Sequence, residues 1–539
     1  MKMLEKKNIN IQIYLSLIVI SLAISIYTQW PALSSPYVIN DDVRQLIYWM
    51  GRFHDPQLFN NDIYVQFSSY VTPLGFKWLY YVLTFFMDPV FTGKLLSIFL
   101  FVLSAIFLYK LGEVIQSRYT GIFLFLLFCC YPVHIERFAG GLERAFAFPL
   151  LILFLFYLQQ FKIKECAFTL ALQILFYPAI FLISFFCLIF TLLFTPKKAS
   201  EYFNDKKSIM RILLPIIILC IFLIYKFISK PEFLGSLTDI QTILSNQSSM
   251  VYGRSPSLPV KSIFFVAQEL LFSHKFFFFA LPFYLMALIY DIFQKKSYSS
   301  HKYKITFFLL FSSILAYLLA RSFLLKLYFP IKYVEYSLPL VSLIIIACAA
   351  GFIIRIINSR WMRVVFLVIF VFFAHLFYVD SIKPGIGCEI DQRRQVPLFT
   401  YIGALPKDSL ILANPYLSDD VSCFSRKKVF VKYELSHPWF NDYAKIIQQR
   451  LIDFYLVYFS ESGEEIYEFC KNNGIGFIIV DKTDFSEEDL NKLASYTESS
   501  SVKKGKAFFL LNIPKEKILF QTSDGRYFVI KPDTKTLSH

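Results

Sequence analysis

The segment Ile39-Asn40-Asp41-Asp42-Val43-Arg44-Gln45-Leu46-Ile47-Tyr48-Trp49-Met50 follows the first hydrophobic stretch of a chain of 539 residues. Apolar residues over positions 43–53 recur at the spacing that places them on one face of a helix. Asn40 is the predicted N-cap, and Asp41 and Asp42 suit the positive end of the helix dipole. With Trp49 beside its apolar face, this helix is expected to lie in a membrane interface. Two adjacent carboxylates would then face the lipid headgroups, although helix capping alone also explains an Asp-Asp pair.

Composition excludes an ordinary soluble protein. The chain is 56% hydrophobic and 19% aromatic, and its mean hydropathy is +0.53. A soluble chain of this length has too little interior to bury so much apolar surface, so we predict a polytopic α-helical membrane protein. The formal charge is +15, but residues 380–539 carry a net charge of −1 and the first 379 residues a net charge of +16. Because the positive charge belongs to the hydrophobic part, it indicates membrane orientation and no nucleic-acid partner.

Eleven stretches are apolar enough to be candidate transmembrane helices, on a requirement of about 20 residues that several of them miss. They cover residues 11–30, 92–112, 119–133, 145–161, 166–177, 178–195, 212–229, 275–293, 305–325, 337–357 and 362–379. The two pieces that flank Tyr177-Pro178 are also compatible with one kinked helix, and residues 76–87 with either a further span or an interfacial helix. We therefore expect about 11 transmembrane helices.

Charge supports this arrangement. With the N-terminus in the cytoplasm, the cytoplasmic ends hold 19 basic and six acidic residues. This excess of Lys and Arg is what the positive-inside rule requires. An odd number of spans places the C-terminus outside. The expected location is an integral membrane protein of the bacterial plasma (inner) membrane, although the endoplasmic reticulum would give the same topology.

The chain divides into two predicted domains, a transmembrane module of residues 1–379 and a soluble extracytoplasmic α/β domain of residues 380–539. In the second, strand-like runs alternate with helical patterns, which favours a parallel core followed by an antiparallel hairpin around Asp524-Gly525. The predicted strands cover 410–413, 429–433, 475–480, 507–511, 518–520 and 527–530, and the predicted helices cover 442–458, 463–472 and 486–495.

Three outer loops hold the unusual polar residues. The first loop contains Asp41, Asp42, Arg44 and Asp62, the second contains Glu136, Arg137, Glu143 and Arg144, and the third contains Lys332. Charged groups at a membrane surface are costly unless they are paired or solvated, which favours a functional role. Paired carboxylates can supply a general base, and Arg and Lys can bind phosphate.

This arrangement resembles the GT-C glycosyltransferases, membrane enzymes that take a sugar from a polyprenyl-phosphate donor, such as protein O-mannosyltransferases and lipid A aminoarabinose transferases. The resemblance rests on Asp41-Asp42-Val43-Arg44 directly after the first span, which is similar to the family's Asp-[Asp/Glu]-x-Arg start of its first interfacial helix. Supporting motifs are the run 55–62 (Asp-Pro-Gln-Leu-Phe-Asn-Asn-Asp), the loop between Arg137 and Arg144, and Lys332-Tyr333 before a late span. The resemblance covers the membrane part, and the C-terminal tail matches no domain of the family.

The resemblance implies an inverting sugar transfer in which Asp41 is the catalytic base and Asp42 its neighbour. Arg137, Arg144, Lys332 and Arg44 are the candidate ligands of the donor phosphate. Arg44 has an alternative role, in which it holds Asp41 in place. The expected partners are a lipid-linked sugar donor, membrane lipids, and a glycan, glycolipid or protein acceptor.

The sequence leaves the cofactor open. Some members of this family use a divalent metal such as Mg²⁺ or Mn²⁺, and others do not. Asp62, Glu136 and Glu143 are the carboxylates assigned to such a metal on the donor phosphate.

Two other functions remain as alternatives. The first is a transporter or flippase of a solute or a lipid-linked sugar. Transporters have interrupted helices near the membrane midplane, whereas this chain holds only 18 glycines and its charges gather in the outer loops. The second alternative is a polysaccharide ligase or polymerase, which would use a large late periplasmic loop.

Overall fold

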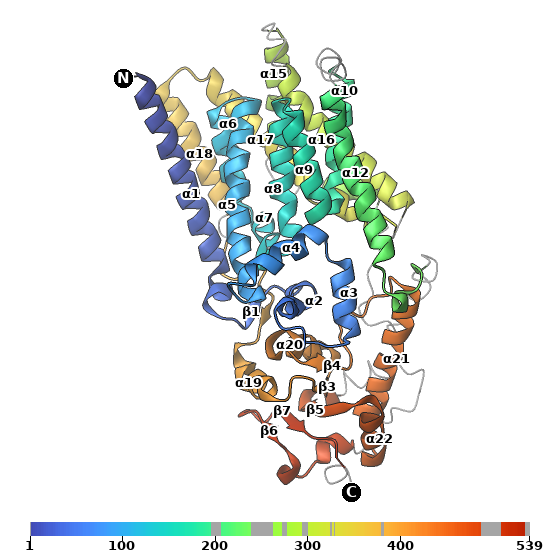
Figure 1. The fold of residues 1–539 in the computed structure, drawn as a ribbon. Coiled ribbons are helices and arrows are strands. Elements are labelled where there is room, and N and C mark those ends of the chain that lie inside the picture. Colours follow the sequence, from blue (N-terminus) through green and yellow to red (C-terminus); the bar gives the residue numbers. More distant parts are fainter. Residues whose placement is uncertain are drawn as a thin grey trace.

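The computed structural model describes residues 2–195, 206–238, 262–271, 277–293, 300–323, 326–327, 329–378, 382–486 and 508–533. Long helices run side by side at one end of the molecule, and a small sheet with short helices lies at the other end (Figure 1). The elements of the first outer loop lie between these two parts. We call the two parts the helix bundle and the C-terminal region, the latter comprising the described residues from 382 to 533.

Each of the eleven stretches predicted as spans coincides with a helix of the bundle. These helices are α1 (Lys2–Ser34), α5 (Pro89–Ile115), α6 (Arg118–Cys130), α8 (Ala147–Gln159), α9 (Ile163–Phe176), α10 (Pro178–Leu193), α12 (Lys206–Ile228), α15 (Phe277–Phe293), α16 (Ser300–Ser322), α17 (Ser337–Ile356) and α18 (Arg360–Tyr378). The sequence also left open one kinked helix around Pro178, and the structure has two helices there, α9 and α10. A further short helix, α14 (Ile263–Leu271), was not predicted.

Helix length separates the bundle helices into two groups. Among the described residues, α1, α5, α16 and the stretch Pro330–Ile356 that contains α17 are long and apolar enough to cross a membrane. The helix α6 and the following segment Pro132–Gly141 together make a fifth such unit, bent by 71°. The apolar stretches Pro178–Leu193 in α10, Leu213–Ile228 in α12 and Phe277–Asp291 in α15 are shorter. The described part of the chain is thus a mostly helical structure with several candidate membrane spans.

The helix α17 is the centre of the bundle, where it packs against α6, α15 and α16. Nearly all of its residues are buried, from Leu338 to Ile354. Its sequence is apolar around the whole circumference, and a helix of that kind is stable only when other helices surround it. In contrast, α1 exposes Ile11 and Leu15 on the outside of the bundle.

The first outer loop differs from its prediction. Instead of one amphipathic helix over 43–53, the chain forms a short helix α2 (Val43–Leu46) and a 3₁₀ helix η1 (Tyr48–Phe53). Trp49 is only 3% exposed. The loop around it packs against the bundle helix α5 and against the C-terminal region, so this side chain does not face lipid as the prediction required. The predicted cap is also displaced: Asp42 occupies the N-cap, and its N–H donates to the side chain of Asn40 at 3.1 Å.

Two further helices of the first loop lead back to the bundle, α3 (Ile63–Val71) and α4 (Leu74–Leu83). The ten residues of α4 rise about 15 Å, half of the roughly 30 Å of a hydrocarbon core, so this helix does not span a membrane. Trp78 and Phe86 lie exposed in and after α4. Of the two alternatives for residues 76–87, the structure therefore favours the interfacial helix.

The C-terminal region contains a five-stranded sheet in the order β4-β3-β5-β7-β6. The strands β3 (Leu410–Leu412), β4 (Lys428–Val429) and β5 (Ile475–Asp481) are parallel, and β6 (Phe520–Gln521) and β7 (Tyr527–Ile530) form an antiparallel hairpin that joins β5. This is the predicted parallel core with a C-terminal hairpin. The helices of the region are α19 (Val396–Ala404), α20 (Pro415–Ser425), α21 (Asn441–Tyr458) and α22 (Gly463–Asn473).

Some predictions in this region differ from the structure. The predicted strand 507–511 is a 3₁₀ helix, η10 (Phe509–Asn512), in its described part. The helices α19 and α20 were not predicted, and the predicted helix 486–495 lies, apart from its first residue, outside the described residues. The proposed domain boundary at 379/380 also lies outside them.

The C-terminal region and the first loop share a core. A small antiparallel pair joins β1 (Val38–Ile39) to β2 (Ile390–Asp391). One continuous cluster of buried apolar side chains extends from Phe101 in the bundle through Trp49 to Val431 in the C-terminal region. The C-terminal region is therefore packed onto the first loop over an apolar contact.

Candidate functional site

Asp41 and Asp42 lie at the start of α2 and are partly accessible, with 30% and 25% of their side chains exposed. Their carboxylates face different cations. Asp41 forms an ion pair with Arg44, and Asp42 forms one with Arg144 of the second outer loop. Asp42 also accepts a hydrogen bond from Gln45 at 3.0 Å. The adjacent carboxylates are thus separately fixed, and the second of them connects two outer loops.

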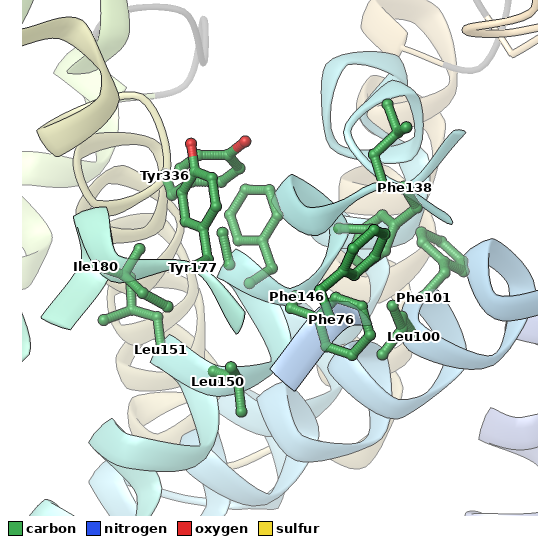
Figure 2. Packing of buried hydrophobic residues seen from close by; sticks show 14 of the residues in the cluster. Phe76, Leu100, Phe101, Phe138, Phe146, Leu150, Leu151, Tyr177, Ile180 and Tyr336 are labelled. Atoms are coloured by element: carbon green, nitrogen blue, oxygen red, sulfur yellow. The ribbon is translucent and has the colours of Figure 1, made fainter. Parts of the chain in front are cut away.

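The second outer loop comprises α7 (Pro132–Glu136), η2 (Ala139–Gly141) and η3 (Glu143–Phe146). Aromatic side chains anchor it in the bundle. Phe138 packs edge-on against Phe101 at 5.5 Å between ring centroids (Figure 2). Phe146 stacks on Phe176 at 4.6 Å between ring centroids. In the same loop Arg137 keeps 26% of its side chain exposed, whereas His134 is buried. Arg144 is 20% exposed and also donates to the side chain of Asn40 at 3.1 Å.

The third loop contributes Lys332, which lies in the 3₁₀ helix η6 (Pro330–Tyr333), and Glu335. The carboxylate of Glu335 is 3.1 Å from the Lys332 ammonium and 3.4 Å from the Arg137 guanidinium. Glu335 is almost buried, at 5% exposure, whereas Lys332 and Arg137 are 23% and 26% exposed. The two cations are therefore held by a carboxylate behind them and keep part of their surface open.

Electrostatic contact joins these groups into one cluster. Burial lowers the pKa of Arg144, and Asp42, Tyr336 and Glu335 raise it, with a net rise that keeps the guanidinium charged. Arg137 lies over the ring of Tyr336 at 5.8 Å from its centroid. We define the outer cluster as Asp42, Arg137, Arg144, Lys332 and Glu335. The structure brings the three predicted loops together in it.

Arg44 of α2 pairs with carboxylates that do not belong to the outer cluster. Its guanidinium contacts Asp41, Asp420 at 2.9 Å and Glu434 at 3.7 Å, and the side chain is 7% exposed. A cation that is buried among carboxylates has little surface left for a phosphate. The geometry favours the alternative in which Arg44 holds Asp41 in place. Sequence reasoning missed Asp420 and Glu434, because nothing local marks residues that lie 376 and 390 positions from Arg44.

The three carboxylates assigned to a metal do not come together. In the described part of the chain there is no group of three or more His, Cys, Asp and Glu side chains that suits a metal ion. Asp62 is buried as the N-cap of α3, where it accepts the N–H groups of Tyr64 at 2.7 Å and Val65 at 3.2 Å. Glu136 is exposed on α7. The set Asp62, Glu136 and Glu143 is therefore not a shared metal site in this structure.

Glu143 is adjacent to the outer cluster. Burial raises the pKa of its carboxyl to about 7, against the opposing effect of Lys226 and Lys332. A carboxyl with this pKa changes charge in the neutral range, and it does so beside the cations that the sequence assigned to phosphate.

No family model matches the chain, and no curated protein matches it in sequence. Solved structures do match. ArnT from Cupriavidus metallidurans bound to undecaprenyl phosphate aligns with a TM-score of 0.53 and 10% identity, over 98% of this chain and 99% of that one. The archaeal oligosaccharyltransferase AglB from Archaeoglobus fulgidus, in complex with an inhibitory peptide and a dolichol-phosphate, aligns with a TM-score of 0.52 and 11% identity, over 93% of this chain and 75% of that one.

A further structure of the Archaeoglobus fulgidus oligosaccharyltransferase, a complex with Zn and sulfate, aligns with a TM-score of 0.50 and 11% identity, over 89% of this chain and 70% of that one. At these identities the comparison is one of folds. The resemblance to GT-C enzymes that the first loop indicated is confirmed at this level: the chain has the fold of ArnT and AglB over most of its length.

Proposed function

We propose that this protein is an integral membrane glycosyltransferase of the GT-C type. It transfers a sugar from a polyprenyl-phosphate donor to an extracytoplasmic acceptor, which is a glycolipid, a polysaccharide or a protein. The observation that carries the proposal is the position of two partly exposed carboxylates, Asp41 and Asp42, of which Asp41 pairs with Arg44 and Asp42 pairs with Arg144 of the second outer loop. The shared fold with ArnT, whose structure holds undecaprenyl phosphate, supports it.

The proposed reaction inverts the anomeric carbon. Asp41 accepts the proton of an acceptor hydroxyl or amine as the oxygen or nitrogen forms a bond to that carbon. The bond between the anomeric carbon and the phosphate oxygen breaks, and its electron pair leaves with polyprenyl phosphate. Arg137, Arg144 and Lys332 stabilise the charge that develops on the phosphate, because preorganised cations act most strongly where charge appears.

The proposed orientation follows from charge and helix order. The protein has about 11 spans and a cytoplasmic N-terminus, and the outer cluster and residues 380–539 lie on the extracytoplasmic side of a bacterial plasma membrane. The lysine- and arginine-rich ends of the bundle helices then lie on the cytoplasmic side, in agreement with the positive-inside rule.

The test is a transfer assay with purified protein in proteoliposomes, labelled polyprenyl-phosphate sugars and a glycolipid extract. We expect wild type to move label to an acceptor, and Asp41→Asn to lose at least about 100-fold in kcat while it binds the donor, because a general base contributes roughly 10²–10⁴-fold. Transfer that survives Asp41→Asn but not Asp42→Asn would move the base to Asp42. Wild type that carries label across the bilayer and never transfers it would be a transporter.

The same assay tests the donor site. Arg137→Ala is expected to raise the donor KM about 10-fold, since a charge-assisted hydrogen bond contributes about 1.5–3 kcal/mol. The matched control is Arg118→Ala, which removes an exposed guanidinium at the start of α6 that is paired with Glu113 and with no residue of the outer cluster among the ion pairs of the described residues. A chelator in the assay decides whether transfer requires a divalent metal.

A further inference from the structure

Both carboxylates of the proposed site are connected to the C-terminal region through their neighbours on α2. Asp41 pairs with Arg44, and Arg44 pairs with Asp420 of α20 at 2.9 Å. Asp42 accepts from Gln45 at 3.0 Å, and Gln45 donates to Glu434 at 2.6 Å. Each partly exposed aspartate is thus connected through a side chain of α2 to a carboxylate of the C-terminal region. We call these two chains of contacts relays: the first is Asp41–Arg44–Asp420 and the second is Asp42–Gln45–Glu434.

We propose that Asp420 and Glu434 are positioning residues for sugar transfer, which fix Arg44 and Gln45 and through them set the orientation of the Asp41 and Asp42 carboxylates. This inference rests on the proposed function. It gives the C-terminal region a part in the site itself, in addition to any contact with an acceptor.

The two aspartates differ in burial from the residues that hold them. The side chains of Arg44, Asp420 and Glu434 are 6–7% exposed, whereas those of Asp41 and Asp42 are 30% and 25% exposed. A substrate at the surface therefore meets the two aspartates and not the residues behind them. Buried ion pairs hold their geometry strongly, since loss of one partner leaves the other charge buried and unpaired.

Asp420 and Glu434 are themselves held by other residues of the C-terminal region. Asp420 accepts a further hydrogen bond from Gln392 at 2.7 Å. The backbone N–H of Glu434 donates to the buried carboxylate of Asp419 at 3.0 Å. The ammonium of Lys432 is fully buried over the ring of Tyr48, 3.4 Å from its centroid. Asp420 and Glu434 each have a further partner within the C-terminal region, and these contacts oppose a shift of either carboxylate with Arg44.

The second relay has an additional support on the backbone of the first loop. Glu389 of the C-terminal region accepts the side-chain N–H of Asn40 at 3.0 Å and the backbone N–H of Asp41 at 3.2 Å. Asn40 in turn accepts from Asp42 and Arg144. The turn that carries both aspartates is therefore held by hydrogen bonds with Glu389, with Arg144 and within the turn itself through Asn40.

The test compares kcat and the donor KM of variants in full-length protein in proteoliposomes. Asp420→Asn keeps the shape of the side chain and removes its charge. We expect its kcat to fall about 10–100-fold, because small misplacement of a reacting group costs up to about 100-fold. The donor KM and the donor Kd should change by less than about 2-fold, since the outer cluster is intact. Glu434→Gln should act in the same direction.

Two matched controls remove contacts of the C-terminal region that do not involve Arg44. Lys407→Ala breaks the exposed pair with Asp55 at 2.8 Å, and Arg426→Ala breaks the exposed pair with Asp88. Both variants should keep the wild-type kcat. If their kcat falls as much as that of Asp420→Asn, the loss comes from weaker packing of the C-terminal region on the rest of the molecule. The positioning role of Asp420 is then overturned.

A double variant separates a role through Arg44 from a general structural one. In an Arg44→Ala background, Asp420→Asn should cause no additional loss of kcat, because the relay is already broken. An equal loss in both backgrounds would contradict the inference. If Asp420→Asn does not fold, Asp420→Glu serves instead, since it keeps the charge and displaces the guanidinium, and an unchanged kcat there would also contradict it.

The two proposals fail in different ways. If wild type transfers no sugar from any donor, the proposed function is wrong. If wild type transfers sugar and Asp420→Asn turns over at the wild-type kcat, the function stands and only the positioning role is wrong.

Discussion

The two aspartates of the first loop have different environments although they are neighbours in sequence. Successive residues at the start of a helix point about 100° apart, so adjacent side chains face different partners. Asp41 therefore faces Arg44 one turn along, and Asp42 faces Arg144 of the second loop. Asp41 is held by Arg44 of the helix that follows it, and Asp42 is held by Arg144, which we assign to the donor phosphate.

The raised pKa of Glu143 predicts that donor binding depends on pH. The pKa of this buried carboxyl is raised to about 7, so it is mostly neutral below that pH and mostly charged above it. As the pH rises, a negative charge appears beside Lys332 and Arg144 and opposes the phosphate. We expect the donor Kd to increase roughly 5-fold between about pH 6 and about pH 8, since a nearby like charge costs about 1 kcal/mol in a partly solvated site.

The measurement is a titration with a polyprenyl-phosphate sugar, a phosphodiester whose own charge is constant over this range. Glu143→Gln should abolish the pH dependence and bind with the low-pH affinity throughout. Glu136→Gln, which removes an exposed carboxylate of the same loop, is the control and should behave as wild type. An unchanged slope in Glu143→Gln would assign the titration to another group.

At the scale of elements, the second outer loop is placed by a close backbone contact with α5. A Cβ on Gly93 would lie 2.3 Å from the carbonyl oxygen of Gly140, and a Cβ on Gly141 would lie 2.2 Å from the carbonyl oxygen of Gly93. Gly140 and Gly141 also have φ angles of 77° and 59°, which favour glycine. The loop that carries Arg137 and Arg144 can lie against α5 only because these positions have no side chain.

This contact makes Gly93→Ala a test of the loop position. The added methyl group must displace the loop, at a cost of about 1–3 kcal/mol in the free energy of unfolding. We expect a lower Tm in detergent and a weaker affinity for the donor. Gly403→Ala is the control, since the nearest atom to its Cβ would be 3.9 Å away and Ala in a helix is favoured by about 0.5–1 kcal/mol. Equal Tm values for the two variants would contradict the close contact.

At the scale of the whole molecule, the C-terminal region and the helix bundle behave as one packed body around the first loop. The apolar cluster is continuous from bundle to sheet, and the strand pair β1–β2 and the pair Arg44–Asp420 cross the same boundary. Contacts of this kind are mostly buried and are screened little by salt.

This packing predicts the outcome of a backbone cut. If a protease site is inserted after Lys383, which is exposed, the cleaved halves should elute together in gel filtration in mild detergent, in low and high salt. They should also retain donor binding. Elution of a separate C-terminal fragment would show that the region is an independent domain tethered by its linker.

Part of this structure is determined by the sequence alone, because its signals are local. The helices of the bundle follow from the hydropathy of each stretch, and each of the eleven predicted stretches contains a helix in its described part. The parallel strands and the hairpin around Asp524 follow from short apolar runs and turn residues. The meeting of three outer loops was also predictable in outline, since helix order places them at one end of the bundle.

The tertiary structure alone decided the environment of the site. Residues 43–53 have the periodicity of an interfacial helix, but the structure divides them into α2 and η1, which pack against the bundle and the C-terminal region, and Trp49 is buried. Asp62 caps α3 instead of joining Glu136 and Glu143. The contacts of Arg44 with Asp420 and Glu434 join residues 376 and 390 positions apart, and no local pattern encodes a partner at that distance. Such pairs form because burial of a guanidinium is unfavourable until a carboxylate from another element reaches it.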